Sequence, residues 1–115
     1  MSKKSKRVMR SASELLEAIE ALRSVLAGYE SVVTDLIARV DQGDEMVEAI
    51  QGVNGAKVRP EVTEAMDAFE AARHQVRLAM VAAALEQGAS ASEVGRALGI
   101  SRQLASRLAS EVEAT

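Results

Sequence analysis

Apolar side chains recur from Leu15 to Val40 at alternating steps of four and three residues without a break, and this pattern is typical of a long helix. Ser11 and Ser13 precede it as capping residue types, so we expect a helix over 13–40. Leucine dominates the d positions and β-branched residues share the a positions, which favours a two-stranded association. The side chains expected at the dimer interface are Leu15, Ile19, Leu22, Leu26, Tyr29, Val33, Leu36 and Val40.

This apolar stripe is wider than a pair of helices needs, because Leu16, Val25, Val32 and Ile37 flank the repeat. A third or fourth helix must therefore cover it. The best candidate is the segment 60–85, which Pro60 opens as a residue suited to the first helical position.

Between these two long helices we expect a short helix over 44–51 and a loop over 52–59. Asn54-Gly55 is a strong turn dipeptide, able even to close a small hairpin. The helix over 60–85 ends at Gln87-Gly88. Its alanine-rich later turns, 79–84, allow further helices to pack closely on it.

Residues 90–111, SASEVGRALGISRQLASRLASE, predict two short amphipathic helices joined by a tight turn. Ser90 and Glu93 have the spacing of a capping box. Gly99 supplies the conformational freedom that a sharp turn needs, and Ser101 is a good N-cap for the second helix. Gly95 lies inside the first helix, where it costs about 1 kcal/mol of helix propensity, so we expect it to allow a close approach of the second helix.

These residues resemble the homeodomain-like helix-turn-helix of site-specific resolvases and invertases and of many small bacterial repressors. The resemblance covers about a fifth of the chain, and it rests on Gly95, Gly99 and the apolar residues around the turn, Val94, Leu98, Ile100 and Leu108. Two positions depart from the family pattern. Ala105 stands where the family usually has Val or Ile, and Leu104 where it usually has a polar residue, which predicts a rotated second helix or extra packing against it.

The resemblance implies binding to double-stranded DNA, with the second helix in the major groove. Arginine and glutamine suit bidentate contacts with guanine and adenine edges. We expect Arg102, Gln103 and Ser106 to contact bases, with Ser110 on the same outward arc; the phosphate contacts are expected from Arg107, Ser90, Ser92, Arg96 and Ser101. The alternative is a helical hairpin without DNA affinity, because two amphipathic helices joined by a glycine turn can show such a pattern by chance.

The charges are segregated along the chain, although the net charge is only −3. Residues 1–10 contain five bases and no acid, residues 11–72 four bases and thirteen acids, and residues 73–115 five bases and four acids. Attraction to phosphate depends on local positive potential, so the nearly neutral C-terminal region remains compatible with DNA. We expect 1–12 to be a basic disordered arm, which either only solubilises the chain or follows DNA phosphates.

The composition argues against several function classes. The chain has no cysteine, and its single histidine, His74, has no partners at metal-ligand spacing, so we expect neither enzyme activity nor a metal, cofactor or small-molecule ligand. No segment approaches the roughly 20 apolar residues of a membrane span. Only two aromatic residues are present, which disfavours RNA binding by base stacking.

Together these features predict an all-α protein with a long N-terminal oligomerisation helix and a C-terminal three-helix head. The expected divisions are an arm over 1–12, a helical oligomerisation region over 13–52, a loop over 53–59 and a helix-turn-helix domain over 60–115. The expected function is sequence-specific binding to double-stranded DNA as a homodimer or higher even oligomer, in a cytoplasmic, nucleoid-associated regulator. The alternative is a protein-interaction adaptor that uses the long helix and has little or no DNA affinity.

Overall fold

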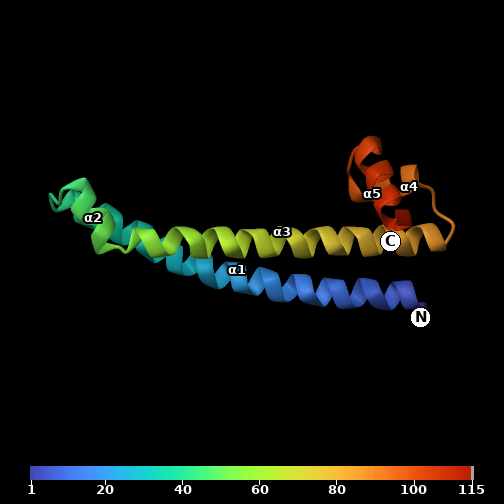
Figure 1. The fold of residues 1–115 in the computed structure, drawn as a ribbon, viewed down its shortest axis with the longest axis horizontal. Helices are drawn as coiled ribbons and strands as arrows, with labels where there is room; N and C mark the ends of the chain where they lie inside the picture. The colour runs from blue at the N-terminus through green and yellow to red at the C-terminus, as the bar shows by residue number, and fades with distance from the viewer. Residues whose placement is uncertain (115) are drawn as a thin grey trace. The chain divides into compact units, whose positions relative to one another are not determined.

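The computed structural model describes residues 1–114, which form five helices and no strands. The helices are α1 (Lys3–Asp41), α2 (Met46–Gly52), α3 (Gly55–Glu86), α4 (Ala91–Leu98) and α5 (Arg102–Ala114), as labelled in Figure 1. The predicted all-α fold is confirmed, as is the combination of a long N-terminal helix with a helical head near the C-terminus.

Two compact units make up the chain. Unit 1 combines Met1–Leu16 with the chain from Ala71 onward, and unit 2 is Glu17–Glu70. Each unit therefore contains a part of α1 and a part of α3, which run antiparallel within it. The expected boundary in the loop at 53–59 differs from this division, because a helical hairpin makes its contacts across the two helices rather than along one of them.

Helix α1 begins at Lys3, so the first twelve residues are not the disordered arm that their charge predicted. Ser2 caps the helix, because its Oγ accepts a hydrogen bond from the backbone N–H of Ser5 at 3.1 Å. Ser11 is buried, and its hydroxyl donates to two backbone carbonyls of the preceding turn at 2.9 and 3.1 Å. Lys and Arg are good helix formers, so a capped basic segment that packs in unit 1 becomes helical.

Helix α3 also begins earlier than predicted, at Gly55 rather than at Pro60, and the expected loop is reduced to residues 53–54. Asn54 adopts the left-handed conformation with φ +58°, and its carbonyl accepts from the backbone N–H of Lys57 at 3.1 Å. The Asn-Gly dipeptide thus starts a helix instead of a hairpin. Pro60 lies inside α3, where it removes one backbone hydrogen bond near the beginning of the helix.

The hydrophobic core lies in unit 1, where the last turns of α3 meet α4 and α5 (Figure 1). Its centre is formed by Leu78, Val81, Val94 and Leu108, which are 8, 1, 8 and 3 % exposed. The alanines of α3 allow the close packing that their composition predicted. Those that are buried are Ala79, Ala82 and Ala83. The three-helix head is thus built from the end of α3 together with α4 and α5.

Unit 2 has no comparable core. Among its residues Ala49 alone is buried. The partly shielded apolar side chains recur at three- and four-residue steps on α3 and mostly at such steps on α1, where one step of seven spans the exposed Tyr29, as expected where two helices pack along their length. On α1 they are Ala18, Ile19, Leu22, Val25, Val32 and Leu36, and on α3 Val58, Val62, Ala65 and Phe69.

Candidate nucleic-acid interface

The first helix of the head, α4, begins with the predicted capping box. The Ser90 Oγ accepts a hydrogen bond from the backbone N–H of Glu93 at 3.2 Å, and the Glu93 carboxylate accepts from the backbone N–H of Ser90 at 3.4 Å. The Ser90 hydroxyl also donates to that carboxylate at 3.2 Å. Two of the N–H groups left unpaired at a helix start are thereby satisfied, and the Ser90 hydroxyl is already engaged within the protein.

The turn after α4 has the geometry that its glycine predicted. Gly99 adopts φ +69° and forms the C-cap, with its N–H donating to the carbonyl of Arg96 at 3.3 Å. The next N–H, that of Ile100, donates to the carbonyl of Gly95 at 3.0 Å. Ile100 packs against the hydrophobic core, so the turn is held by both hydrogen bonds and burial.

Gly95 marks the closest approach of α4 and α5. It is buried, and a Cβ placed on it would lie 2.9 Å from the Cβ of Ala105, which is itself 2 % exposed. The two small residues therefore face each other across the helix pair. Ala105, where the family usually has a larger residue, fits this contact, because a branched side chain would have to occupy the same space.

Helix α5 turns one face inward and one outward. Ser101 caps it, with its Oγ accepting from the backbone N–H of Leu104 at 3.1 Å. Leu108 is buried in the core, and Leu104 and Val112 pack against it. Leu104, the second departure from the family pattern, therefore adds to the core of the head rather than to its surface.

The opposite face of α5 is polar and open to solvent. Arg102, Gln103, Ser106 and Arg107 line one shallow hollow on it, and Ser110 is exposed as well. A second hollow brings α4 and α5 together, because Ser92 and Arg96 line it beside Arg102. Of the predicted contact residues, eight are exposed and Ser92 is half-buried; the exposed ones are Ser90, Arg96, Ser101, Arg102, Gln103, Ser106, Arg107 and Ser110.

The three arginines of this surface keep their charge available. Within residues 1–114, no carboxylate forms an ion pair with Arg96, Arg102 or Arg107. One acid of the head, Glu111, instead contacts His74 of α3, with 2.9 Å between Oε1 and Nε2. This contact joins α5 to α3 and keeps the Glu111 carboxylate against α3. His74 is half-buried, and Glu111 is its partner in this contact.

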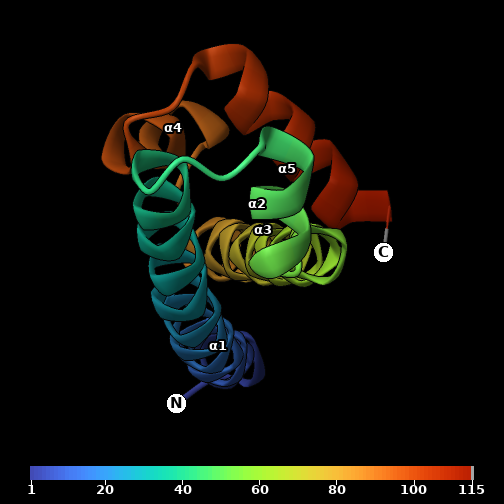
Figure 2. The ribbon, with the colours of Figure 1, turned by 90° about the vertical axis from the view of Figure 1, so that its left-hand side faces the viewer.

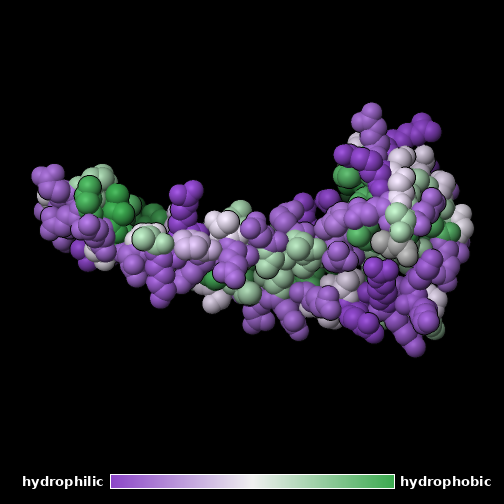
Figure 3. All heavy atoms as spheres, viewed as in Figure 1, coloured by the Kyte–Doolittle hydropathy of each residue, from purple (hydrophilic) through white to green (hydrophobic). Residues whose placement is uncertain are grey.

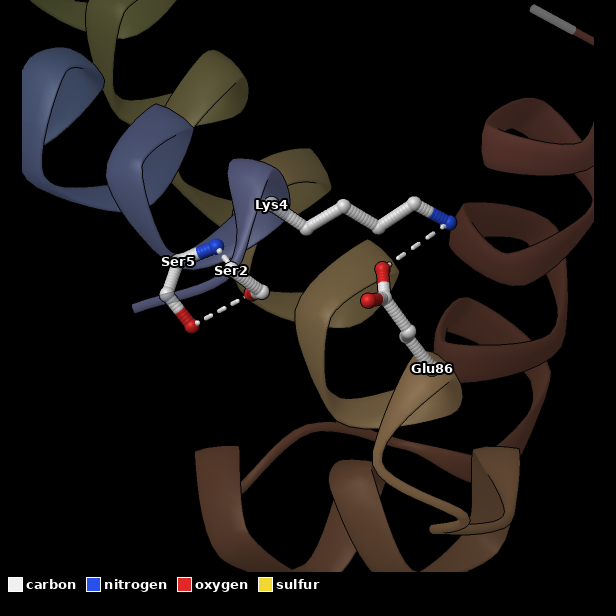
Figure 4. A network of polar contacts seen from close by, with 4 residues as sticks. All are labelled: Ser2, Lys4, Ser5 and Glu86. Atoms are coloured by element: carbon white, nitrogen blue, oxygen red, sulfur yellow. Dashed lines mark hydrogen bonds and ion pairs between the residues drawn. The ribbon is translucent and has the colours of Figure 1, made fainter.

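The basic segment at the start of α1 lies elsewhere in unit 1. Figures 1 and 2 place it on the side of α3 away from α4 and α5. Lys4 forms an ion pair with Glu86 near the end of α3, with 3.6 Å between Nζ and Oε2 (Figure 4). The hydroxyl of Ser2 donates to that of Ser5 at 3.1 Å beside it. The Ser2 cap was not predicted, although serine is a preferred N-cap residue and the good helix formers Lys3 and Lys4 follow it.

The residues predicted to form the dimer interface divide into two groups. Leu15, Ile19, Leu22 and Leu36 are half-buried within the chain. The remaining four are exposed at 38 to 44 %, and they are Leu26, Tyr29, Val33 and Val40. Part of the predicted dimer interface thus packs within the chain, and part of it faces solvent.

Residues 1–114 contain no group of three His, Asp or Glu side chains that could hold a metal ion. No helix in this range is both long enough and apolar enough to cross a membrane. No family model matches the chain, and no curated protein or solved structure matches it either.

Proposed function

We propose that this protein binds double-stranded DNA as an oligomer, with α5 in the major groove. The observation that carries the proposal is the outward face of α5, where Arg102, Gln103, Ser106 and Arg107 are exposed around one hollow. Arginine, glutamine and serine all donate hydrogen bonds, and the major groove is wide enough for a helix that presents them.

The surroundings of α5 support the same function. Arg96 of α4 is exposed beside Arg102, so positive charge extends from one helix to the other. The backbone N–H groups at the start of a helix favour anions, and Ser101 leaves its hydroxyl hydrogen free to donate to a phosphate while its oxygen accepts from Leu104. Ser90 is the weakest of the proposed phosphate contacts, because its hydroxyl is already used twice within the capping box.

Two arginine variants test whether Arg102 contacts bases and Arg107 contacts phosphates. Arg102→Ala should weaken binding to the preferred sequence by about 1–3 kcal/mol and relax the sequence preference, because a base contact is lost. Arg107→Ala should weaken binding to all sequences alike and reduce the salt dependence, because a phosphate contact is lost. The preferred sequence comes first from selection among random duplex oligonucleotides, and affinities are then measured by fluorescence anisotropy over a salt series.

Lys57→Ala is the matched control, since it removes one positive charge from the exposed surface of unit 2. It should leave DNA affinity nearly unchanged. Equal losses for Arg102→Ala and Arg107→Ala on selected and random DNA would contradict the assigned roles. Absence of any complex in low-salt buffer would remove the DNA-binding proposal altogether.

The second candidate function is that of an adaptor that binds another protein through unit 2. The observation in its favour is the set of large apolar side chains that unit 2 exposes, among them Ile37 at 65 % and Val47 at 67 %. Figure 3 shows hydrophobic atoms gathered over α2. This function would be favoured if the protein showed no affinity for DNA and bound a protein partner tightly.

A further inference from the structure

Unit 2 exposes apolar surface on one particular edge of α1. Helix α3 shields the edge of α1 that contains Leu22, Val25 and Val32. Leu26 and Val33, each one residue farther along than Val25 and Val32, remain 44 and 38 % exposed. The apolar stripe of α1 therefore has two edges, and a single hairpin covers only one of them.

Helix α3 contributes to the same exposed face. Val33 of α1 and Arg59 of α3 are both exposed and both line one open cavity of about 450 Å³, whose wall also includes Ile50 of α2, so we place them on the same open side of the hairpin. Leu26 lies seven residues before Val33 on α1, and Met66 lies seven residues after Arg59 on α3. Met66 is 52 % exposed. Because the helices are antiparallel, seven residues back along α1 corresponds to seven residues forward along α3. Leu26 and Met66 therefore share this face, which is two helices wide.

The face is large enough for a weak, reversible interface. The part of the stripe that extends equally to both sides of Leu26, from Ile19 to Val33, is about 21 Å long at 1.5 Å per residue, and two packed helices have axes 8–10 Å apart, which gives a face roughly 20 Å wide. The product is roughly 400 Å² per copy, or about 800 Å² in total, in the range of weak and transient interfaces. A unit with one buried residue gains the core that it lacks if this face is covered.

The residues along the Leu26 edge of α1 are arranged almost symmetrically about Leu26. Ile19, which is half-buried, and Val33, which is exposed, lie seven residues on either side of it. Arg23 and Glu30 lie three and four residues away on opposite sides. Interfaces between two identical copies use the same patch on each, so a pattern that reads alike in both directions complements itself when the copies are antiparallel. Arg23 of each copy then faces Glu30 of the other, whereas in a parallel pair these e positions would face the uncharged g positions Ala18 and Val25.

We propose that a second copy of this chain covers the face of unit 2 around Leu26 and Met66, with the two α1 helices antiparallel and the twofold axis near Leu26. This inference specifies the surface and the orientation of the oligomer in the proposed function, and it does not depend on DNA binding. It replaces the dimer interface predicted from the a and d positions, because Leu22 and Leu36 are shielded within the chain while Leu26 and Val33 are exposed and can contact a second copy.

The absence of cysteine allows disulfide trapping to test the orientation. Leu26→Cys should give a disulfide-linked dimer under mild oxidation, because its partner sulfur lies at the twofold axis. Ile19→Cys and Val33→Cys should each remain largely unlinked alone but form a mixed dimer when combined. Glu20→Cys, on the polar side of α1, is the control for random collision, and circular dichroism checks that each variant is folded.

Charge exchange gives a second, independent measurement. Arg23→Glu should weaken dimerisation by about 10-fold in sedimentation equilibrium, because two symmetry-related attractions become repulsions. The double variant Arg23→Glu/Glu30→Arg should restore the original dissociation constant. A parallel pair would leave the dissociation constant of the single variant unchanged, since Arg23 would face no charged residue across the interface.

Several outcomes would overturn the inference. A monomer at all concentrations, or self-linking of Ile19→Cys and Val33→Cys separately, would contradict it directly. Stable capture of a different protein by this face, with the isolated chain monomeric, would favour the adaptor instead. DNA binding is measured separately on the same variants, so failure of the dimer and failure of the DNA-binding proposal remain distinguishable.

Discussion

Gly95→Ala should destabilise the head, although alanine is a better helix former than glycine. Alanine would gain up to about 1 kcal/mol of helix propensity. Its new Cβ, however, would lie 2.9 Å from the Cβ of Ala105, which is attached directly to the backbone and cannot rotate away. Carbon atoms pack at about 3.5–4.0 Å, so α4 and α5 would have to separate by roughly 0.5–1 Å. Overpacking of this kind costs about 1–3 kcal/mol, and we expect a net loss of about 1 kcal/mol.

Gly28→Ala is the matched control, because Gly28 lies inside α1 with nothing within 4 Å of its Cβ position. It should stabilise the protein by up to about 1 kcal/mol. The difference between the two variants, measured by urea unfolding with circular dichroism, isolates the packing cost at Gly95. Amide hydrogen exchange in α4 and α5 shows whether the loss is local. Equal stabilisation by both substitutions would refute the close approach of these helices.

Two further substitutions test the capping and the core of the head by the same unfolding measurement. Ser90→Ala should cost about 1 kcal/mol, since it removes the side-chain acceptor of the capping box; Ser90→Thr keeps the hydroxyl and should cost less, and no difference between the two would argue against the cap. Leu108→Ala should cost about 2–5 kcal/mol, because this side chain is 3 % exposed in the core. Leu16→Ala, at a position 67 % exposed, should change stability by less than about 0.5 kcal/mol; similar losses for both leucines would place the core elsewhere.

The candidate DNA-contacting surface could be predicted largely from local sequence. The Ser90 cap, the left-handed Gly99, the close contact at Gly95 and the outward position of Arg102 depend on residues within about ten positions of one another. Such features follow from side-chain chemistry and helical periodicity, which a single sequence displays. Its role in binding DNA stays a prediction.

The ends of the long helices were harder to predict. Residues 3–10 lack an apolar repeat, so periodicity gave no prediction of a helix there. In the structure the Ser2 cap begins this part of α1, and the ion pair of Lys4 with Glu86 joins it to α3. Pro60 suggested a helix start that Asn54 and Gly55 take instead. These boundaries depend on competition between local signals and on partners distant in sequence.

The amino-acid sequence by itself determined that the chain is helical, where the turn between α4 and α5 falls and that α1 carries more apolar surface than one partner helix can cover, because these properties follow from composition, local turn chemistry and periodicity. Only the tertiary structure decided which edge of that surface the chain covers for itself. Burial is a relation between distant residues, so Leu22 and Leu26, alike in sequence, became distinguishable only when α3 was seen to shield one and leave the other exposed.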